Sequence, residues 1–369
     1  MKAKLFFCLV FVAVVCAGRT AAYSAAAYAV IAANTGVLLD GLQENQRLPM
    51  ASTTKIMTGL LAAEEKDIDR IITVSPECAG VEGSSMYLQA GEQLPLRDVL
   101  YGLMLCSGND AAECIAEQCG GRDAFVARMN ARAQELGLTD THFDNPSGLD
   151  GETHYTTAYE LAKLAAAALR NETFAEVVAT KSYTSGTRTM VNHNKMLRLY
   201  EGAVGVKTGY TMTAGRCLVS AAERNGRTVV AVTLHDGNDW NDHIQMLDAA
   251  FATMQREQWA QAGEAACSIP VETGTKAKVN AVYAEDISAY LLQKEEADLQ
   301  ISCVDFLYAP VKKGTVCGHA KLVCEDTVLQ ETELICGSNA ELDVSQEDTS
   351  KKERFLLWWD RFRKRIVTE

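Results

Sequence analysis

The order of strand-like and helix-like segments is the feature that most constrains this fold. Within residues 23–265, strand patterns come first, at residues 27–31 and 37–40, and the hairpin signal Asn34-Thr35-Gly36 joins them. Strand patterns also lie near the end of these residues, where Asn225-Gly226 predicts a second tight hairpin. Helical patterns fill the middle, so we expect a mixed sheet whose first and last strands pair and which packs against helices. The further predicted helices are 53–65, 96–105, 110–118, 123–136, 157–169 and 239–258, and the further predicted strands are 181–191, 204–222 and 227–235.

A change of pattern near residue 267 marks a second domain. Short alternating segments, such as 276–283 and 321–325, lie between turn-like stretches as far as Asp343. A chain of 369 residues is long enough for a full-size core domain and a smaller companion. The expected divisions are a signal peptide (1–22), a core domain (23–265), a β-rich domain (266–345), and a linker with a terminal amphipathic helix (346–369).

The first 22 residues have the pattern of a secretory signal peptide. Lys2 and Lys4 precede an apolar run over residues 5–17, which is too short to span a bilayer comfortably. Thr20-Ala21-Ala22 is an acceptable cleavage site, and cleavage after Ala27 is an alternative. The other interpretation is an uncleaved N-terminal anchor. We expect the protein to be exported.

The C-terminal residues predict an attachment to a membrane surface. Apolar and aromatic side chains recur there at helical spacing beside basic ones, after a polar and acidic linker. A short amphipathic helix with tryptophans and a basic face suits anionic lipids, but it is too short to span. We expect residues 355–367 to hold the protein on the outer face of the cytoplasmic membrane; a helix packed on its own protein is the alternative. The side chains concerned are Phe355, Trp358, Trp359, Arg361, Phe362, Arg363, Lys364, Arg365 and Ile366.

Charge and cysteine content bear on the possible partners. A formal net charge of −13 opposes binding to a nucleic-acid backbone, so we expect no nucleic-acid partner. Of the 12 cysteines, Cys8 and Cys16 lie in the signal peptide, and the rest form no Cys-x-x-Cys pair that would indicate zinc. Export permits disulfides. Cys317 and Cys324 are candidates to face each other across a hairpin, but the sequence assigns no pairing.

Ser52-Thr53-Thr54-Lys55 is the first of three motifs that carry candidate chemistry. At a helix start, Ser-x-x-Lys spacing puts serine and lysine one turn apart on the same face. A serine hydroxyl needs an adjacent base, and a lysine can serve when desolvation and neighbouring cations lower its pKa. Backbone N–H groups at the helix N-terminus add donors for an oxyanion. Taken alone, the pattern favours an ordinary N-cap serine over a nucleophile.

Ser107-Gly108-Asn109 is the second motif, and it lies between two predicted helices. The Ser107 hydroxyl can relay a proton among the lysine, the nucleophile and the leaving group. The Asn109 amide can hold a substrate carbonyl or orient Lys55. Taken alone, a serine–glycine–asparagine sequence also makes a plain loop and helix cap.

Lys207-Thr208-Gly209 is the third motif, and it lies on a predicted strand. A lysine and a hydroxyl beside a glycine can bind a substrate carboxylate. Gly209 would let a substrate backbone approach the strand closely. The alternative is a surface strand with a bulge.

In this order along the chain, the three motifs resemble those of the penicillin-recognising serine enzymes. Within that group the chain is similar to the low-molecular-mass penicillin-binding proteins that are serine D-alanyl-D-alanine carboxypeptidases. The resemblance covers roughly residues 23–345, and the terminal basic helix looks like the membrane anchor of that family. The segments that carry it are 49–58 (PMASTTKIMT), 105–111 (LCSGNDA), 145–150 (NPSGLD), 192–194 (NHN) and 205–219 (GVKTGYTMTAGRCLV).

The resemblance implies an α+β fold, with a five-stranded antiparallel sheet flanked by helical clusters, then a small all-β domain and a C-terminal amphipathic helix. It implies removal of the terminal D-alanine from peptidoglycan stem pentapeptides, with β-lactam antibiotics as covalent inhibitors and with no metal or organic cofactor. The roles implied by motif are nucleophile for Ser52, general base for Lys55, proton relay for Ser107, substrate positioning for Asn109, carboxylate binding for Lys207 and Thr208 beside Gly209, and oxyanion-hole N–H groups for Ser52 and Tyr210.

Two other functions fit the sequence less well. A class A-like β-lactamase needs a carboxylate that activates the deacylating water, and the sequence shows no convincing Glu-x-x-x-Asn element between Asn109 and Lys207. A catalytically silent cell-wall scaffold would not need all three motifs intact. Penicillin labelling separates the scaffold from both enzymes, and rapid nitrocefin turnover separates the β-lactamase.

Two further expectations concern the roles of histidines. His193 stands where some relatives carry a permanent cation, so it would make binding of a substrate carboxylate pH-sensitive; a plain surface histidine is the alternative. The spacing of His235, Asp236 and His243 matches no standard metal site. We expect these three to be strand-end and helix-surface residues.

Overall fold

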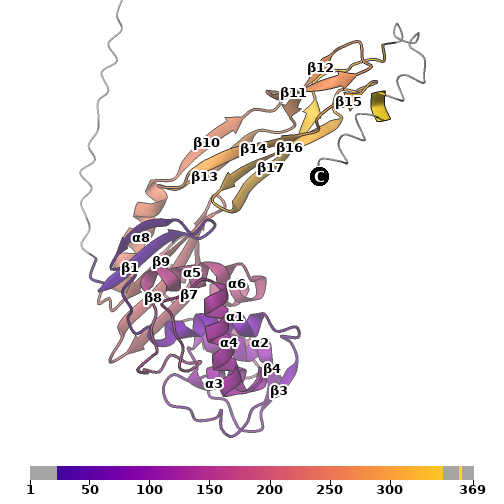
Figure 1. Cartoon of the computed structure of the whole chain (residues 1–369). Coiled ribbons are helices and arrows are strands. Elements are labelled where there is room, and N and C mark those ends of the chain that lie inside the picture. Colours follow the sequence, from indigo (N-terminus) through magenta and orange to yellow (C-terminus); the bar gives the residue numbers. More distant parts are fainter. Residues whose placement is uncertain (1–22, 344–356, 360–369) are drawn as a thin grey trace, which may run out of the picture.

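The computed structural model describes residues 23–343 and 357–359, and it shows a rounded α+β body followed by an elongated all-β body (Figure 1). Five antiparallel strands form the sheet of the first body in the order β2-β1-β9-β8-β7, as expected. The first and last strands of the region pair, since β1 (Ala27–Ala32) lies beside β9 (Arg227–Leu234). The other strands are β2 (Leu38–Leu42), β7 (Ala203–Thr211) and β8 (Gly215–Arg224).

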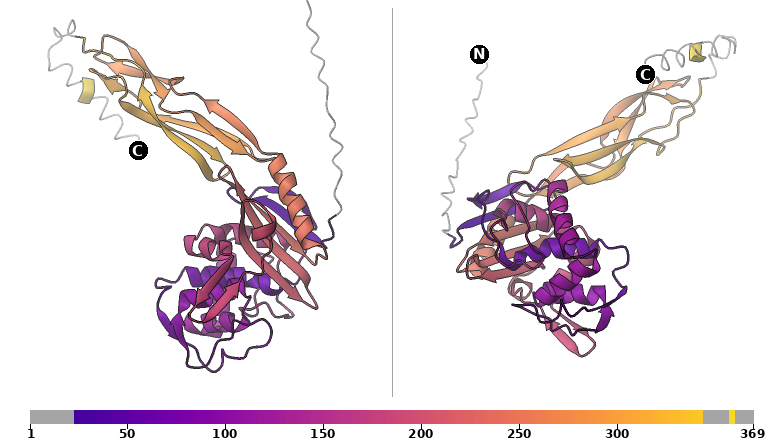
Figure 2. Two further views of the ribbon diagram at one scale, coloured as in Figure 1. Left: turned by 180° about the vertical axis from the view of Figure 1, so that it is seen from behind. Right: turned by 60° about the horizontal axis from the view of Figure 1, so that its bottom comes forward.

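Helices cover both faces of this sheet, and the alternation of residues along β1 shows why. Ile31 and its alternate neighbours pack in one core with α1 (Lys55–Ala63) and α5 (Ala158–Leu169). Val30 and its alternate neighbours pack in a second core with α8 (Asp239–Ala252), which lies on the other side of the sheet (Figure 2). Successive side chains of a strand face opposite ways, so this all-apolar strand is suited to a position between two layers.

The segment between β2 and β7 forms the helical cluster that faces α1. One part of it differs from the expectation: residues 181–191 form two short strands instead of one, because Gly186 turns the chain with a φ of 56°. The elements of this segment are η1 (Ala51–Thr54), α2 (Leu96–Leu105), α3 (Asn109–Gln118), α4 (Arg122–Glu135), α6 (Glu172–Ala179), α7 (Met196–Leu199), and the hairpins β3 (Ile71–Thr73) with β4 (Gln93–Pro95) and β5 (Ser182–Ser185) with β6 (Arg188–Val191).

The last helix of the α+β body is shorter than its sequence pattern predicts. α8 ends at Ala252, whereas we expected a helix to residue 258. Residues from Gln255 onwards form β10 (Gln255–Ala260), which pairs with β13 (Ile287–Leu291) far along the chain. Long-range pairing therefore overrides the local helical preference of these polar residues, and the all-β body begins at β10.

A six-stranded sheet in the order β14-β16-β17-β12-β11-β15 forms most of the all-β body. Its core is built from alternate residues, such as Ala320 and Leu322 on one strand. The predicted β-rich C-terminal domain is thereby confirmed in kind. Its strands are β11 (Ala265–Glu272), β12 (Lys278–Tyr283), β14 (Ala297–Cys303), β15 (Leu307–Tyr308), β16 (Val316–Cys324) and β17 (Thr327–Cys336).

The cysteines of this body do not pair across a hairpin as suggested. Cys317 and Cys324 both lie on β16, so they cannot face each other, and that expectation is wrong. A disulfide joins Cys267 on β11 to Cys303 on β14 instead. The hairpin turn lies one residue beyond Cys324 rather than between the two cysteines.

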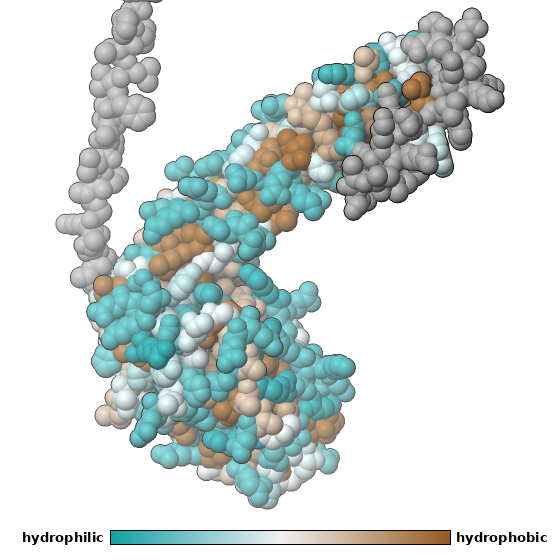
Figure 3. Space-filling model, viewed as in Figure 1, coloured by the Kyte–Doolittle hydropathy of each residue, from teal (hydrophilic) through white to brown (hydrophobic). Residues whose placement is uncertain are grey.

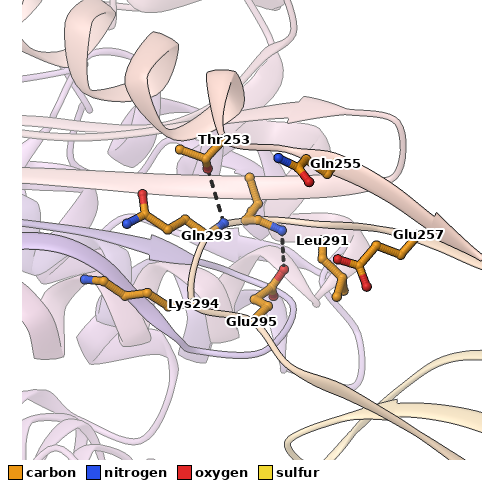
Figure 4. A pocket seen from close by; sticks show the side chains of 8 residues that line it. Thr253, Gln255, Glu257, Leu291, Gln293, Lys294 and Glu295 are labelled. Carbon is orange, nitrogen blue, oxygen red and sulfur yellow. Dashed lines mark hydrogen bonds between the residues drawn. The ribbon is translucent and has the colours of Figure 1, made fainter. Parts of the chain in front are cut away.

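The two bodies meet through a buried ion pair. Arg227 on β9 pairs with Glu295, which follows β13, and both side chains are buried. Glu295 also accepts hydrogen bonds from the Thr35 hydroxyl at 2.6 Å and from the Leu292 N–H at 2.8 Å. A shallow polar pocket opens beside this junction, at the end of α8 (Figure 4). The ion pair and its partners therefore fasten the all-β body to the sheet.

The visible surface of the α+β body is mostly hydrophilic, and apolar side chains gather in patches along the all-β body (Figure 3). Among the described residues, no helix is both long and apolar enough to cross a membrane. The predicted signal peptide (1–22) lies outside the described residues, as does most of the predicted terminal helix. Residues 357–359 of that helix are described; they are helical and exposed.

Candidate active site

Ser52 lies in the single turn η1, which leads directly into α1. Lys55 is the first residue of α1, and its Nζ lies 2.9 Å from the Ser52 Oγ. The turn is held in part by the Thr53 hydroxyl, which donates to the Met50 carbonyl at 2.6 Å. The helix start therefore directs the serine hydroxyl and the lysine amine toward each other.

Lys55 is completely buried among neutral hydrogen-bond partners. Its Nζ lies 2.7 Å from the Asn109 Oδ1 and 2.5 Å from the Ser147 carbonyl oxygen. Burial lowers the pKa of Lys55 well below its usual value, and the positive charge of Lys207 lowers it further. A neutral amine has two N–H donors and one lone pair. In the structure the Lys55 Nζ donates to both carbonyl oxygens and to the Ser52 Oγ, so loss of the proton that faces Ser52 would direct a lone pair at the serine hydroxyl.

The loop between α2 and α3 brings Ser107 and Asn109 to the same place. Ser107 is buried and has a φ of 60°, a conformation that is uncommon for residues other than glycine and that clusters at functional sites. The Asn109 amide is held at both ends, because Oδ1 accepts from Lys55 and Nδ2 donates to the Glu82 carbonyl at 2.6 Å. These two contacts fix which face of the amide meets the lysine.

Edge strand β7 carries the third motif past the start of α1. A methyl group at Gly209 would lie 3.1 Å from the Ser52 backbone nitrogen, so strand and turn are in contact here. Lys207 is buried, its Nζ donates to the Thr208 carbonyl at 2.9 Å, and burial lowers its pKa to about 7. Tyr210, the next residue along β7, is 61% exposed.

The loop around Ser147 supports the site, although sequence reasoning gave its residues no role. The Asn145 Oδ1 accepts backbone N–H groups of residues 147, 148 and 149, which folds the loop and aims the Ser147 carbonyl at Lys55. Gly148 has a φ of 90°, and a methyl group there would lie 2.0 Å from the Ala51 carbonyl oxygen. The composition Asn-Pro-Ser-Gly does signal a turn, but a backbone acceptor has no side chain that would reveal it.

His154 is a second residue that sequence reasoning missed. The Asp144 N–H donates to its Nδ1 at 3.0 Å, so Nε2 carries the proton and donates to the Thr54 hydroxyl at 2.7 Å. The Thr54 hydroxyl donates in turn to the Ala51 carbonyl at 2.8 Å. Burial lowers the pKa of His154 to about 4, so the ring is neutral near neutral pH. This series of bonds positions the backbone directly before Ser52.

The other histidines separate into two cases. His193 is exposed at the edge of the site, and burial together with the charge of Lys207 lowers its pKa. His243 was expected on a helix surface, which is wrong. It is buried between the hydroxyls of Ser220 and Thr233, at 2.6 and 3.0 Å, and burial lowers its pKa to about 3. Within residues 23–343, no three acidic, histidine or cysteine side chains gather as a metal-ligand group.

A serine beside a buried lysine, set between a helix start and the edge strand of an antiparallel sheet, is suited to acyl transfer. The lysine can take the hydroxyl proton, and backbone N–H groups at a helix start can stabilise an oxyanion. This combination of fold and motifs defines the class of penicillin-recognising serine enzymes.

Comparison with known proteins narrows the class to one family. The family described as D-alanyl-D-alanine carboxypeptidase matches residues 15–238, and the family described as penicillin-binding protein 5, C-terminal domain, matches residues 255–341. The chain therefore belongs to the D-alanyl-D-alanine carboxypeptidase family, and it is a serine hydrolase with that activity.

Individual relatives agree with this assignment. The D-alanyl-D-alanine carboxypeptidase DacF of Bacillus subtilis (strain 168) is 32% identical over 359 residues, which cover 92% of this chain and 89% of the relative. The structure of penicillin binding protein 5 from Haemophilus influenzae has a TM-score of 0.63 at 26% identity, and covers 86% of this chain and 98% of its own. The Streptomyces K15 DD-transpeptidase has a TM-score of 0.60 at 33% identity, over 62% and 98%. The predicted family, fold and activity are confirmed.

Proposed function

We propose that Ser52 is the acylated nucleophile for peptidoglycan stem pentapeptides and that Lys55 is its base. The Ser52 Oγ attacks the carbonyl carbon of the penultimate D-alanine as its proton passes to the Lys55 Nζ. The C–N bond to the terminal D-alanine then breaks, and the leaving amine takes up a proton through Ser107. Water hydrolyses the ester, which releases the shortened peptide and restores the serine. The observation that carries this proposal is the hydrogen-bond pattern at the buried Lys55, whose Nζ is held by two neutral carbonyl acceptors and lies 2.9 Å from the Ser52 Oγ.

Strand β7 supplies the substrate contacts in this proposal. Lys207 and Thr208 bind the terminal carboxylate, and the N–H groups of Ser52 and Tyr210 stabilise the oxyanion. The contact of Gly209 with the Ser52 nitrogen supports it, because it brings strand and helix start close enough for their N–H groups to act together. Penicillins carry a carboxylate and a reactive carbonyl in a similar arrangement, so they acylate the same serine and are hydrolysed slowly.

Release of free D-alanine from a diacyl-Lys-D-Ala-D-Ala peptide tests the assignment. Ser52→Ala and Lys55→Met should each lower kcat/KM by more than about a thousandfold. Lys195→Met, which removes an exposed lysine outside the site, should leave kcat/KM unchanged. Release by Ser52→Ala at the wild-type rate would show that Ser52 is not the nucleophile. A wild type that neither releases D-alanine nor binds fluorescent penicillin would support the silent scaffold, and rapid nitrocefin turnover would support the β-lactamase.

Export and membrane attachment complete the proposal. Residues 1–22 direct export, and residues 355–367 hold the mature enzyme on the outer face of the cytoplasmic membrane, facing peptidoglycan. The all-β body supports this arrangement, because the chain leaves it near Asp343, beside Thr273, at the end remote from the catalytic body (Figure 1). Removing residues 351–369 should release an active enzyme from the membrane fraction. Retention of the truncated enzyme in that fraction would refute the anchor.

A further inference from the structure

Two buried cysteines lie beside each other at the middle of α3. Cys78 lies in segment 74–92, which joins β3 to β4, and Cys114 lies in the middle of α3. Both are buried, at 2% and 0% exposed, and their thiols lie close enough to interact directly. The Cys78 thiol also donates to the Glu117 Oε2 at 2.9 Å, and Glu117 follows Cys114 by one turn on the same face of α3. Two independent contacts therefore place Cys78 over Cys114.

Segment 74–92 meets the helix a second time at the active site. The Asn109 N–H donates to the Ser84 carbonyl at 2.7 Å, and its Nδ2 donates to the Glu82 carbonyl at 2.6 Å. Gly83 approaches so closely that a methyl group there would lie 2.5 Å from the Asn109 Nδ2. The Asp110 carboxylate accepts the N–H groups of residues 86 and 88, both at 3.0 Å. The docking of this segment on α3 therefore sets where Asn109 presents its Oδ1 to the lysine.

We propose that Cys78 and Cys114 are an oxidation site whose disulfide fastens segment 74–92 to α3 and keeps Asn109 in place. The two thiols give up two protons and two electrons to an oxidant of the disulfide class, such as oxidised glutathione or an exported oxidoreductase. One thiolate attacks a sulfur of the oxidant to form a mixed disulfide. The second thiolate then displaces the reduced oxidant as the Cys78–Cys114 bond forms. The effect on catalysis rests on the proposed role of Asn109, whereas formation of the bond does not.

The surroundings of the pair determine when the bond forms. Contact with Cys78 and burial both raise the pKa of the Cys114 thiol, and a protonated thiol is a poor nucleophile. Exchange in the folded protein is therefore slow, so oxidation takes place during folding after export, before segment 74–92 has docked. The same burial then shields the finished bond from small reductants.

Peptide mapping of the full-length protein tests the bond directly. The exported protein is purified without reductant, denatured in iodoacetamide and digested without reduction. We expect a cross-linked peptide that joins Cys78 to Cys114. It should be absent from Cys78→Ser and retained in Cys119→Ser, which removes another buried thiol next to the end of the same helix. Alkylation of both thiols, even after refolding with oxidised glutathione, would overturn the proposal.

Two further readouts separate the bond from the site it supports. Cys78→Ser should lower the melting temperature by on the order of 5–10 °C and kcat/KM for D-alanine release by about threefold to tenfold, and Cys119→Ser should change neither by as much. Equal kcat/KM in cross-linked wild type and Cys78→Ser would refute the coupling to Asn109.

Loss of D-alanine release in every variant, with the cross-link present, would overturn the proposed function but not the disulfide. If Cys78→Ser does not fold, Cys78→Ala/Cys114→Ala replaces it, since it leaves no lone thiol and no buried hydroxyl.

Discussion

Substrate capture by Lys207 is expected to weaken as the pH rises through about 7. Burial lowers the pKa of Lys207 to about 7, and only the protonated ammonium attracts the terminal carboxylate of the substrate. The titratable groups that interact with it are Lys55, His193 and Cys106. Lysine is charged below its pKa, so the charged fraction falls from about nine-tenths at about pH 6 to about one-tenth at about pH 8. We therefore expect kcat/KM to fall about tenfold for each pH unit above about 7.

Substitution of the lysine by arginine tests which group titrates. A guanidinium stays protonated throughout this pH range, so Lys207→Arg should remove the alkaline decline. Its kcat/KM should also be about tenfold lower near pH 6, because a planar fork does not replace a point charge in a tight site. The assay is D-alanine release from diacyl-Lys-D-Ala-D-Ala between about pH 5.5 and about pH 9 at constant ionic strength. Penicillin also carries a carboxylate, so its acylation rate should show the same decline.

Two results would contradict this reasoning. A decline that persists in Lys207→Arg would mean that another group, such as Cys106, controls the alkaline side. A wild-type kcat/KM that stays constant to about pH 9 would mean that Lys207 keeps its charge despite its burial. Lys195→Arg is the matched control, because this lysine is exposed, and it should keep the wild-type profile.

Three other substitutions test separate contacts. Gly209→Ala places a methyl group 3.1 Å from the Ser52 nitrogen, so kcat/KM should fall by about 10- to 100-fold with little change in melting temperature. His193→Gln removes a cation that forms only at acid pH, because desolvation and the charge of a neighbouring lysine lower the pKa of His193. The KM for the peptide should then no longer improve at acid pH. An unchanged pH profile of KM would exclude this role. Arg227→Met leaves Glu295 charged and buried, so urea unfolding should show a loss of about 3–5 kcal/mol, most of which Arg227→Met/Glu295→Leu should restore.

Local signals in the sequence were sufficient for much of the fold. The Asn225-Gly226 turn and the apolar strands around it predicted the β8–β9 hairpin, and the strands at both ends of the region predicted the pairing of β1 with β9. The error at the end of α8 lies where a distant partner decides. Residues 255–258 have helical composition, yet they pair with β13, which no local pattern indicates.

The site shows the same division between local and long-range information. Ser52, Lys55 and Asn109 were identified because their side chains form motifs, and the structure brings Ser52 and Asn109 within hydrogen-bond distance of the Lys55 amine. The Ser147 carbonyl was missed because a backbone acceptor has no residue-specific signature. His154 was missed for another reason: its contact with the helix start passes through Thr54, which lies 100 residues earlier.

The two buried lysines of the site must hold opposite protonation states in the same pH range, and burial alone does not achieve this because it lowers the pKa of both. Their partners differ, however. The Lys55 amine is hydrogen-bonded to three neutral groups, whereas the Lys207 amine, within residues 23–343, is hydrogen-bonded to the Thr208 carbonyl alone. A carboxylate bound at Lys207 favours its charged form, while Lys55 stays shielded among its neutral partners. Under the proposed roles, a peptide with a free C-terminal carboxylate would select the productive pair of states, and a peptide without one would leave Lys207 mostly neutral above about pH 7. This difference gives a physical reason for cleavage at the chain terminus.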